Sequence, residues 1–203
     1  MSPSIILFDF DGVIVNTFDF CYQINTICNP DLTPDQYRER FQGNINECIP
    51  KEQKQAAQKG TFDFFAHYTP ELMKQPIEEQ IKELIRTLSK TSKLYIVSST
   101  HTDVIIAFLE QNELLSCFAG VYGNDIERSK VKKFQMILEK EHEEPNHCVL
   151  ITDTLGDIRE AQACQIPSIA VLWGYHDKET LLRGNPVAIV ETVDELKETI
   201  ATL

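Results

Sequence analysis

Short runs of apolar residues alternate with amphipathic segments along most of this chain. The runs show no regular polar alternation, which is typical of parallel strands buried on both faces. From Ile77 onward, a segment with apolar residues at helical spacing separates each run from the next. This alternation predicts an α/β fold built on a doubly wound parallel sheet. The expected strands cover residues 5–8, 94–97, 118–122, 148–152 and 168–172, with an edge strand at 187–190.

The segment at residues 15–75 breaks this alternation, because it contains helical patterns and no convincing strand. One helix start is well marked, since Thr33 stands three residues before Gln36 in the pattern of a capping box. We therefore expect a small helical cap domain at residues 15–75, inserted into a core made of residues 1–14 and 76–203. The insertion leaves and returns at the carboxyl end of a strand, so it should lie over a site at that edge.

Charge and cysteine content limit the partners and the setting of the protein. Nineteen basic and 31 acidic side chains give a formal net charge of −12, which repels nucleic acids and anionic membranes. We expect no targeting segment, no membrane span, and a monomer or weak homodimer. The cysteines form no CxxC pair and most have apolar neighbours, so we expect reduced, buried side chains in a cytoplasmic protein. They are Cys21, Cys28, Cys48, Cys117, Cys148 and Cys164.

Polar side chains gather where three of the predicted strands end. Because the carboxyl ends of parallel strands meet at one edge of the sheet, these side chains should converge there. Clustered carboxylates need a nearby cation to stay ionised, and Mg²⁺ typically binds one or two carboxylates together with phosphate and water oxygens. The set indicates phosphoryl transfer without a GxxxxGK[ST] or GxGxxG nucleotide-binding loop. Its members are Asp9, Asp11, the turn residue Gly12, Ser98, Lys130, Asp153 and Asp157.

The order and spacing of these residues resemble the haloacid dehalogenase superfamily of phosphatases, in the branch with a helical cap after the first strand. The resemblance covers nearly the whole chain, and phosphoglycolate phosphatases and β-phosphoglucomutases are better-known relatives. It implies a Mg²⁺-dependent phosphatase that acts on a small phosphate ester through an aspartyl-phosphate intermediate. The four motifs are Asp9-Phe10-Asp11-Gly12, a serine at Ser98, a lysine at Lys130, and the pair Asp153 and Asp157.

The same resemblance implies a role for each residue. Asp9 is the nucleophile, and Asp11 first protonates the leaving group and then activates water. The metal is held by Asp9, the backbone carbonyl of Asp11, and Asp153, with Asp157 as a further ligand or a supporting group. The residues implied to hold the phosphoryl group are Ser98, Ser99, Lys130 and Gly12.

Simpler interpretations of single residues remain open. Strand-end aspartates are also ordinary turn residues, and Asp157 could be only a helix N-cap. Lys132 and Lys133 compete with Lys130, and we expect the two lysines that do not hold phosphate to lie on a solvated helix face. Other residues with two interpretations are Arg38 and Arg40, which either reach a substrate anion or lie on the surface, and Gly43, which belongs either to a cap loop facing the site or to a plain turn.

Alternative functions also remain open. A phosphomutase would use the same machinery but return the phosphoryl group to a sugar phosphate. A phosphonate hydrolase would need a buried cap lysine, for which Lys51, Lys54 and Lys59 are candidates. A 2-haloacid dehalogenase is disfavoured because that branch lacks the second acid, present here as Asp11. The alternative of another class is a non-catalytic binding protein on the same fold, which the intact Asp9 and Asp11 argue against.

Overall fold

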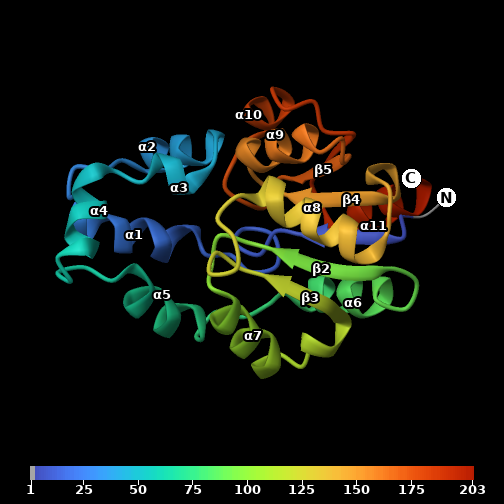
Figure 1. Cartoon of the computed structure of the whole chain (residues 1–203), viewed down its shortest axis with the longest axis horizontal. Helices are drawn as coiled ribbons and strands as arrows, with labels where there is room; N and C mark the ends of the chain where they lie inside the picture. Colours follow the sequence, from blue (N-terminus) through green and yellow to red (C-terminus); the bar gives the residue numbers. More distant parts are fainter. Residues whose placement is uncertain (1–2) are drawn as a thin grey trace.

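The computed structural model describes residues 3–203, which contain a six-stranded parallel sheet with helices on both faces (Figure 1). The strand order is β3-β2-β1-β4-β5-β6. The predicted α/β class and doubly wound sheet are therefore confirmed. The strands are β1 Ile5–Phe8, β2 Lys93–Val97, β3 Phe118–Tyr122, β4 Cys148–Thr152, β5 Ser168–Val171 and β6 Ala188–Val190.

Helices connect the strands and also form a separate helical block, α1 to α5, beyond the carboxyl ends of the strands (Figure 1). The predicted capping box is present, because the Gln36 N–H donates to Thr33 Oγ1 at 3.2 Å and the Thr33 N–H donates to Gln36 Oε1 at 3.0 Å. The α-helices are α1 Phe18–Cys28, α2 Pro34–Glu39, α3 Ile45–Cys48, α4 Lys51–Gln58, α5 Phe64–Leu72, α6 Glu79–Leu88, α7 Thr102–Gln111, α8 Lys130–Glu141, α9 Leu155–Ala163, α10 Lys178–Leu182 and α11 Val193–Thr202. Short 3₁₀ helices are η1 Arg40–Gln42, η2 Leu115–Cys117 and η3 Pro145–His147.

The central strand β1 packs against helices on both of its faces, which explains its unbroken apolar sequence. All four of its residues are buried. Ile6 and Phe8 belong to the core formed with α6, α7 and α11. Ile5 and Leu7 belong to the core formed with α8 and α9. Because alternate strand residues point to opposite faces, this division shows two helical layers around one sheet.

The strand order reverses next to β1, and the polar strand ends meet at this point. β2 and β3 lie on one side of β1, whereas β4, β5 and β6 lie on the other. In open α/β sheets, ligands bind beyond the carboxyl ends of the strands at such a switch point. Phe8 pairs with Ile151 of β4, and the Asp9 N–H donates to the Ile151 carbonyl at 2.9 Å. The register therefore brings Asp9 beside the end of β4, where Asp153 follows.

Four aromatic residues in α5 and just before it form a cluster at the end of the helical block: Phe62, Phe64, Phe65 and Tyr68. Phe62 and Tyr68 are buried, whereas Phe64 and Phe65 are half-buried. The Phe64 and Tyr68 rings stack with their centroids 5.5 Å apart. Phe64, Phe65 and Tyr68 all line the cavity described below. The cluster therefore also supplies one wall of that cavity.

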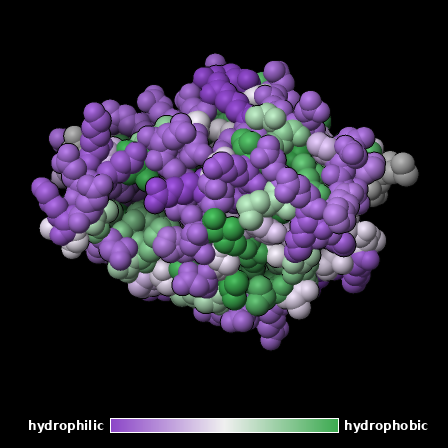
Figure 2. Space-filling model, viewed as in Figure 1, coloured by the Kyte–Doolittle hydropathy of each residue, from purple (hydrophilic) through white to green (hydrophobic). Residues whose placement is uncertain are grey.

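The surface agrees only in part with the expectations from composition. The face seen in Figure 2 is mostly hydrophilic, with an apolar patch near its middle. All six cysteines are free, but the expectation that most are buried is wrong, because apolar sequence neighbours do not fix the side of a helix on which a residue lies. Cys21 and Cys148 are buried, Cys28, Cys117 and Cys164 are half-buried, and Cys48 is exposed. Among residues 3–203, no helix is both long and apolar enough to cross a membrane.

Candidate active site

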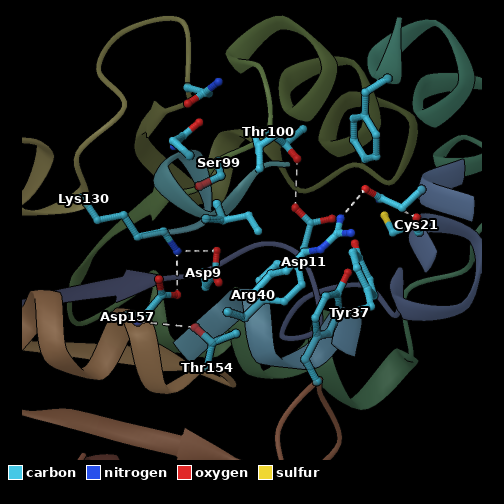
Figure 3. A pocket seen from close by; sticks show the side chains of 18 of the residues that line it. Asp9, Asp11, Cys21, Tyr37, Arg40, Ser99, Thr100, Lys130, Thr154 and Asp157 are labelled. Atoms are coloured by element: carbon cyan, nitrogen blue, oxygen red, sulfur yellow. Dashed lines mark hydrogen bonds and ion pairs between the residues drawn. The ribbon is translucent and has the colours of Figure 1, made fainter. Parts of the chain in front are cut away.

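Lys130 lies between two carboxylates at the carboxyl edge of the sheet. Its Nζ is 2.9 Å from Asp9 Oδ1 and 2.6 Å from Asp157 Oδ2 (Figure 3). None of the three side chains is more than 10% exposed. Lys130 is the first residue of α8, and the N-cap Ser129 accepts a hydrogen bond from the Lys132 N–H. The capped helix start thus fixes a cation beside the aspartate that follows β1.

Burial and ion pairing shift the pKa values of these three groups in different directions. Burial raises the pKa of Asp9 well above its ordinary value, although the Lys130 charge opposes the rise. Burial acts upward on Asp157 too, but the Lys130 charge and the hydrogen bonds to this carboxylate outweigh it and lower its pKa. Burial disfavours the Lys130 charge, yet the charges of Asp157 and Asp9 raise the pKa of Lys130. Lys130 is therefore a buried cation within an otherwise acidic cluster.

The other two lysines at the start of α8 differ from each other. Lys132 is exposed, and its Nζ lies 3.4 Å from Glu127 Oε2, as expected for a solvated face. Lys133 is fully buried, and its Nζ donates to the Ser98 carbonyl at 2.6 Å. The expectation of a solvated position is therefore wrong for Lys133, because it lies one helical turn from Lys130 and shares its inward face. Burial, with the Lys130 charge as a smaller cause, lowers the pKa of Lys133 to about 8.

Asp11 receives one hydrogen bond from the helical block and one from the sheet side. The Tyr68 hydroxyl of α5 donates to Asp11 Oδ1 at 2.7 Å. The Thr100 hydroxyl, which follows β2, donates to Asp11 Oδ2 at 2.9 Å (Figure 3). Sequence reasoning missed both donors, because no spacing rule links Tyr68 or Thr100 to an aspartate so far away in the chain. Together they fix the direction of the Asp11 carboxylate.

Ser98 has its hydroxyl bound to backbone rather than directed into the cavity. The side chain is fully buried, and its Oγ accepts a hydrogen bond from the Thr100 N–H at 3.0 Å. Ser99 and Thr100 line the cavity, whereas Ser98 does not. Ser98 therefore shapes the turn after β2, and its direct contact with a phosphoryl group stays a prediction.

Asp157 is not the N-cap of α9. That position belongs to Thr154, whose Oγ1 accepts a hydrogen bond from the Asp157 N–H at 3.4 Å. The Asp157 carboxylate instead accepts hydrogen bonds from Lys130 at 2.6 Å and from the Thr152 hydroxyl at 2.8 Å. Asp157 thus holds the lysine in place, and the simpler N-cap interpretation is wrong.

Asp153 is a fully buried carboxylate with one unused oxygen. Its Oδ2 accepts a hydrogen bond from the Tyr175 N–H at 2.7 Å, while Oδ1 has no partner among the described residues. Burial raises the pKa of Asp153 to about 7. Glycines make room for it, since a Cβ on Gly12, where φ is +78°, would lie 2.1 Å from Asp153 Oδ2, and a Cβ on Gly174 would lie 2.3 Å from the same atom. A buried oxygen without a partner is costly unless a ligand satisfies it.

The carboxylates fit a hard divalent cation when other oxygens complete its shell. Among residues 3–203, no three His, Cys, Asp or Glu side chains are arranged to hold a metal ion by themselves. Mg²⁺ does not need such a group, because it usually binds one or two carboxylates and keeps water or phosphate oxygens. The unused oxygen of the buried Asp153 suits that requirement. The metal roles of Asp9, Asp11, Asp153 and Asp157 stay predictions.

A cavity of about 200 Å³ lies between these strand ends and the helical block. Its lining unites residues from α1, α5 and the segment at 37–53 with residues of the sheet edge. Three other predicted residues do not line it: Gly12, Ser98 and Asp153. Of the predicted site residues, the cavity is lined by Asp9, Asp11, Ser99, Lys130 and Asp157. Lining residues that no motif marks include Cys21, Asn25, Tyr37, Asn124, Glu160 and Tyr175.

The family of the chain follows from comparison with known proteins. Residues 6–171 match the family model of haloacid dehalogenase-like hydrolases. The chain belongs to this family. The match includes every predicted site residue, so the superfamily suggested by the four motifs is confirmed.

Similar proteins extend over nearly the full length of this haloacid dehalogenase-like hydrolase. A phosphoglycolate phosphatase from Synechococcus elongatus is 23% identical over 212 residues, covering 98% of this chain and 97% of that protein. One from Mesorhizobium japonicum is 24% identical over 220 residues, covering 99% and 96%. A solved haloacid dehalogenase-like family hydrolase from Streptococcus pneumoniae has a TM-score of 0.77 at 23% identity, with 96% of each chain covered. This structural likeness supports the fold.

In this hydrolase the helical block approaches the helices around the sheet closely at Gly156 of α9. A Cβ on Gly156 would lie 2.4 Å from the Gly43 carbonyl oxygen and 2.8 Å from the Phe41 carbonyl oxygen. Phe41 and Gly43 both line the cavity. Gly43 thus belongs to a loop that faces the site, and the glycine at 156 lets that loop approach.

Proposed function

We propose that this chain is a Mg²⁺-dependent phosphatase that hydrolyses a small phosphorylated metabolite through a phosphoryl intermediate on Asp9. The enzyme class rests on the family and on curated relatives that are phosphoglycolate phosphatases. The observation that carries the mechanism is the buried Asp9–Lys130–Asp157 cluster on the cavity wall. We also propose a reducing, cytoplasmic setting, which the six free cysteines support.

Two displacements at phosphorus account for the reaction. First, a carboxylate oxygen of Asp9 bonds to phosphorus while the bond from phosphorus to the ester oxygen breaks, and Asp11 gives its proton to the departing oxygen. Second, Asp11 takes a proton from water, whose oxygen bonds to phosphorus as the bond to Asp9 breaks. The products are an alcohol and inorganic phosphate, and both aspartates return to their starting states.

The first displacement must bring a carboxylate against a phosphate dianion. Lys130 supplies a fixed positive charge 2.9 Å from Asp9, in a buried site where charges act strongly. Asp157 accepts a hydrogen bond from that lysine, and the Thr152 hydroxyl donates to the same Asp157 oxygen, so the lysine is held in place. A Mg²⁺ ion bound by Asp9, Asp153 and the Asp11 carbonyl would neutralise further phosphate charge. Ser99 and Thr100 at the turn after β2 border the same space.

We further propose that residues 15–75 act as a cap over a core made of residues 1–14 and 76–203. The Tyr68 hydrogen bond to Asp11 supports this, because it joins a helix of the block to the acid of the core. The contact of Gly43 with Gly156 supports it as well. A block seated in this way would exclude bulk water during phosphoryl transfer.

Gly156→Ala tests the cap. Backbone carbonyls cannot yield as a flexible side chain does, so the new methyl group should push the Phe41–Gly43 loop away from the site. We expect kcat/KM to fall about 10- to 100-fold, because small misplacements in a closed site are costly. The free energy of unfolding should also fall, by about 1–3 kcal/mol, because the methyl group cannot fit beside the two backbone carbonyls without displacing them. Steady-state kinetics and urea unfolding measure both quantities.

The control for that variant is Gly43→Ala on the opposite side of the same contact. A Cβ there meets nothing within 4 Å, so its effect on kcat/KM should be clearly smaller. The cap proposal is contradicted if Gly156→Ala retains the kinetics of the wild type.

Asp153→Asn tests the cation site without relying on activity. At about ten times its dissociation constant, Mg²⁺ should stabilise the wild type by about 1.4 kcal/mol, which is about 3–5 °C in Tm. Asparagine keeps the size and an acceptor for the Tyr175 N–H but removes the charge, so this shift should disappear. The exposed Asp194→Asn should keep it. Thermal unfolding with and without Mg²⁺ gives the answer, and an unchanged shift in Asp153→Asn would contradict the site.

Release of inorganic phosphate from a panel of phosphate esters with Mg²⁺ tests the proposed function itself. The wild type should hydrolyse at least one ester, and Asp9→Asn should not. No difference between the two proteins across the panel would refute the enzyme and favour a binding protein. Transfer of the phosphoryl group to a sugar hydroxyl, without release of phosphate, would instead identify a phosphomutase.

A further inference from the structure

Arg40 is a cation that faces the cavity without a carboxylate partner. It begins the 3₁₀ helix η1 at the end of α2, is half-buried, and lines the cavity together with Asp11. Figure 3 shows its side chain pointing into the pocket. Among the side chains that the structure describes, no carboxylate pairs with it.

The surroundings hold the guanidinium in place but use few of its donors. Its NH1 donates to Asn25 Oδ1 at 3.0 Å, and its Cζ lies 5.7 Å from the centre of the Tyr37 ring. Asn25 is itself buried and fixed by a hydrogen bond from its Nδ2 to the Cys21 carbonyl at 2.8 Å. A guanidinium has five N–H donors. Among the described residues, only Asn25 accepts a hydrogen bond from this side chain, so a ligand in the cavity can accept from the other donors.

Arg38, two residues earlier, shows the contrast. Its NH1 pairs with Asp35 at 3.2 Å, and its Nε donates to the Tyr175 carbonyl at 3.1 Å. Arg38 does not line the cavity. Arg38 therefore has a carboxylate partner and lies outside the cavity lining, whereas Arg40 has no such partner and borders the space that a substrate would fill.

We propose that Arg40 binds a second anionic group of the substrate, at the end of the cavity away from the transferred phosphate. Because this assignment rests on the proposed phosphatase function, it specifies the substrate class of that site: a small phosphate monoester whose alcohol carries a carboxylate or another phosphate. Lys130 binds at the phosphoryl end, and Arg40 selects the other end. The cavity volume of about 200 Å³ restricts the substrate to a small molecule.

Three esters that differ mainly in the charge of the alcohol part separate this role from a structural one. They are 2-phosphoglycolate with an anionic group, ethyl phosphate with a neutral one, and 2-aminoethyl phosphate with a cationic one. The wild type should prefer the anionic ester in kcat/KM. In Arg40→Gln, the ratio of kcat/KM for the anionic ester to kcat/KM for the neutral ester should fall about 10- to 100-fold, as expected for loss of charge-assisted hydrogen bonds. Lys54→Gln removes a charge from the exposed surface of α4 and should leave the ratio unchanged.

Arg40→Glu gives a test that a merely unfolded or distorted protein would not pass. It should shift the preference toward 2-aminoethyl phosphate, because the charge facing the alcohol part is reversed. An ethanediol bisphosphate in the same assay distinguishes a second phosphate from a carboxylate. If the anionic-to-neutral ratio is the same in wild type, Arg40→Gln and Arg40→Glu, the proposal is overturned.

Binding to catalytically silent protein separates this inference from the proposed function. Titration calorimetry of 2-phosphoglycolate and ethyl phosphate into Asp9→Asn, and into Asp9→Asn with Arg40→Gln, needs no turnover. The anionic ester should bind Asp9→Asn at least about 10-fold more tightly than it binds the double variant. The neutral ester should bind both proteins with the same affinity. Equal loss for both esters, or no loss, refutes the role of Arg40 whether or not the wild type proves to be a phosphatase.

Discussion

Asp9→Asn is expected to lower kcat/KM for every phosphate ester by at least about 10³-fold. The amide cannot form the bond to phosphorus on which both displacements depend, and loss of a nucleophile is among the largest single effects in enzymes. The variant should still fold, because asparagine has the same shape and keeps an oxygen that can accept from the Phe10 N–H, now bound at 2.8 Å. Phosphate release under saturating Mg²⁺, with circular dichroism to confirm folding, measures the effect.

Asp31→Asn is the matched control for this substitution. Asp31 is exposed in the segment between α1 and α2, so the same chemical change should leave both turnover and folding as in the wild type. A folded Asp9→Asn protein with more than about one-tenth of wild-type kcat/KM would remove the nucleophile from the proposed mechanism.

Lys130→Met should have the second-largest effect and should act on stability as well as on activity. It removes the cation between Asp9 and Asp157, both of which are nearly inaccessible to solvent. Leaving buried carboxylates without their partner typically costs about 3–5 kcal/mol of unfolding free energy. Without the fixed charge beside the nucleophile, kcat/KM should also fall by about 10²-fold or more. Urea unfolding and steady-state kinetics measure the two effects.

Two further variants assign these losses to the ion pair. Lys132→Met changes an exposed lysine on the same helix and should cost no more than about 0.5 kcal/mol. Lys130→Met combined with Asp157→Asn removes one of the uncompensated charges, so it should recover part of the stability but none of the activity. If Lys130→Met behaves as Lys132→Met does, Lys130 is not the buried cation of the site.

The sheet was predictable because its signals are local. The apolar run at Ile5–Phe8 can be satisfied only by burial on both faces, and helical periods between such runs leave few topologies. The convergence of Asp9 and Asp157 on Lys130 follows from the same logic, since the carboxyl ends of parallel strands share one edge. The motif spacing and the sheet geometry thus point to the same residues.

Contacts between distant segments could not be predicted in this way. Tyr68 is separated from Asp11 by 57 positions, and an aromatic residue in a helix gives no sign that its hydroxyl will bind a carboxylate. Arg38 and Arg40 are equally plausible from sequence, and only the fold shows which one faces the cavity. Lys133 was expected to be solvated because lysines usually are, yet the start of α8 turns it inward to the Ser98 carbonyl.

Chemical trapping of the phosphoryl group tests the central claim most directly. Wild-type protein mixed with a phosphate ester and Mg²⁺ is quenched rapidly, reduced with borohydride, digested and analysed by peptide mass spectrometry. Reduction of an acyl phosphate converts the aspartate to homoserine. Homoserine should therefore appear at position 9 and at no other aspartate, and Asp9→Asn should give none. Turnover with no label at position 9, or with a phosphoryl group trapped on another residue, would contradict the role assigned to Asp9.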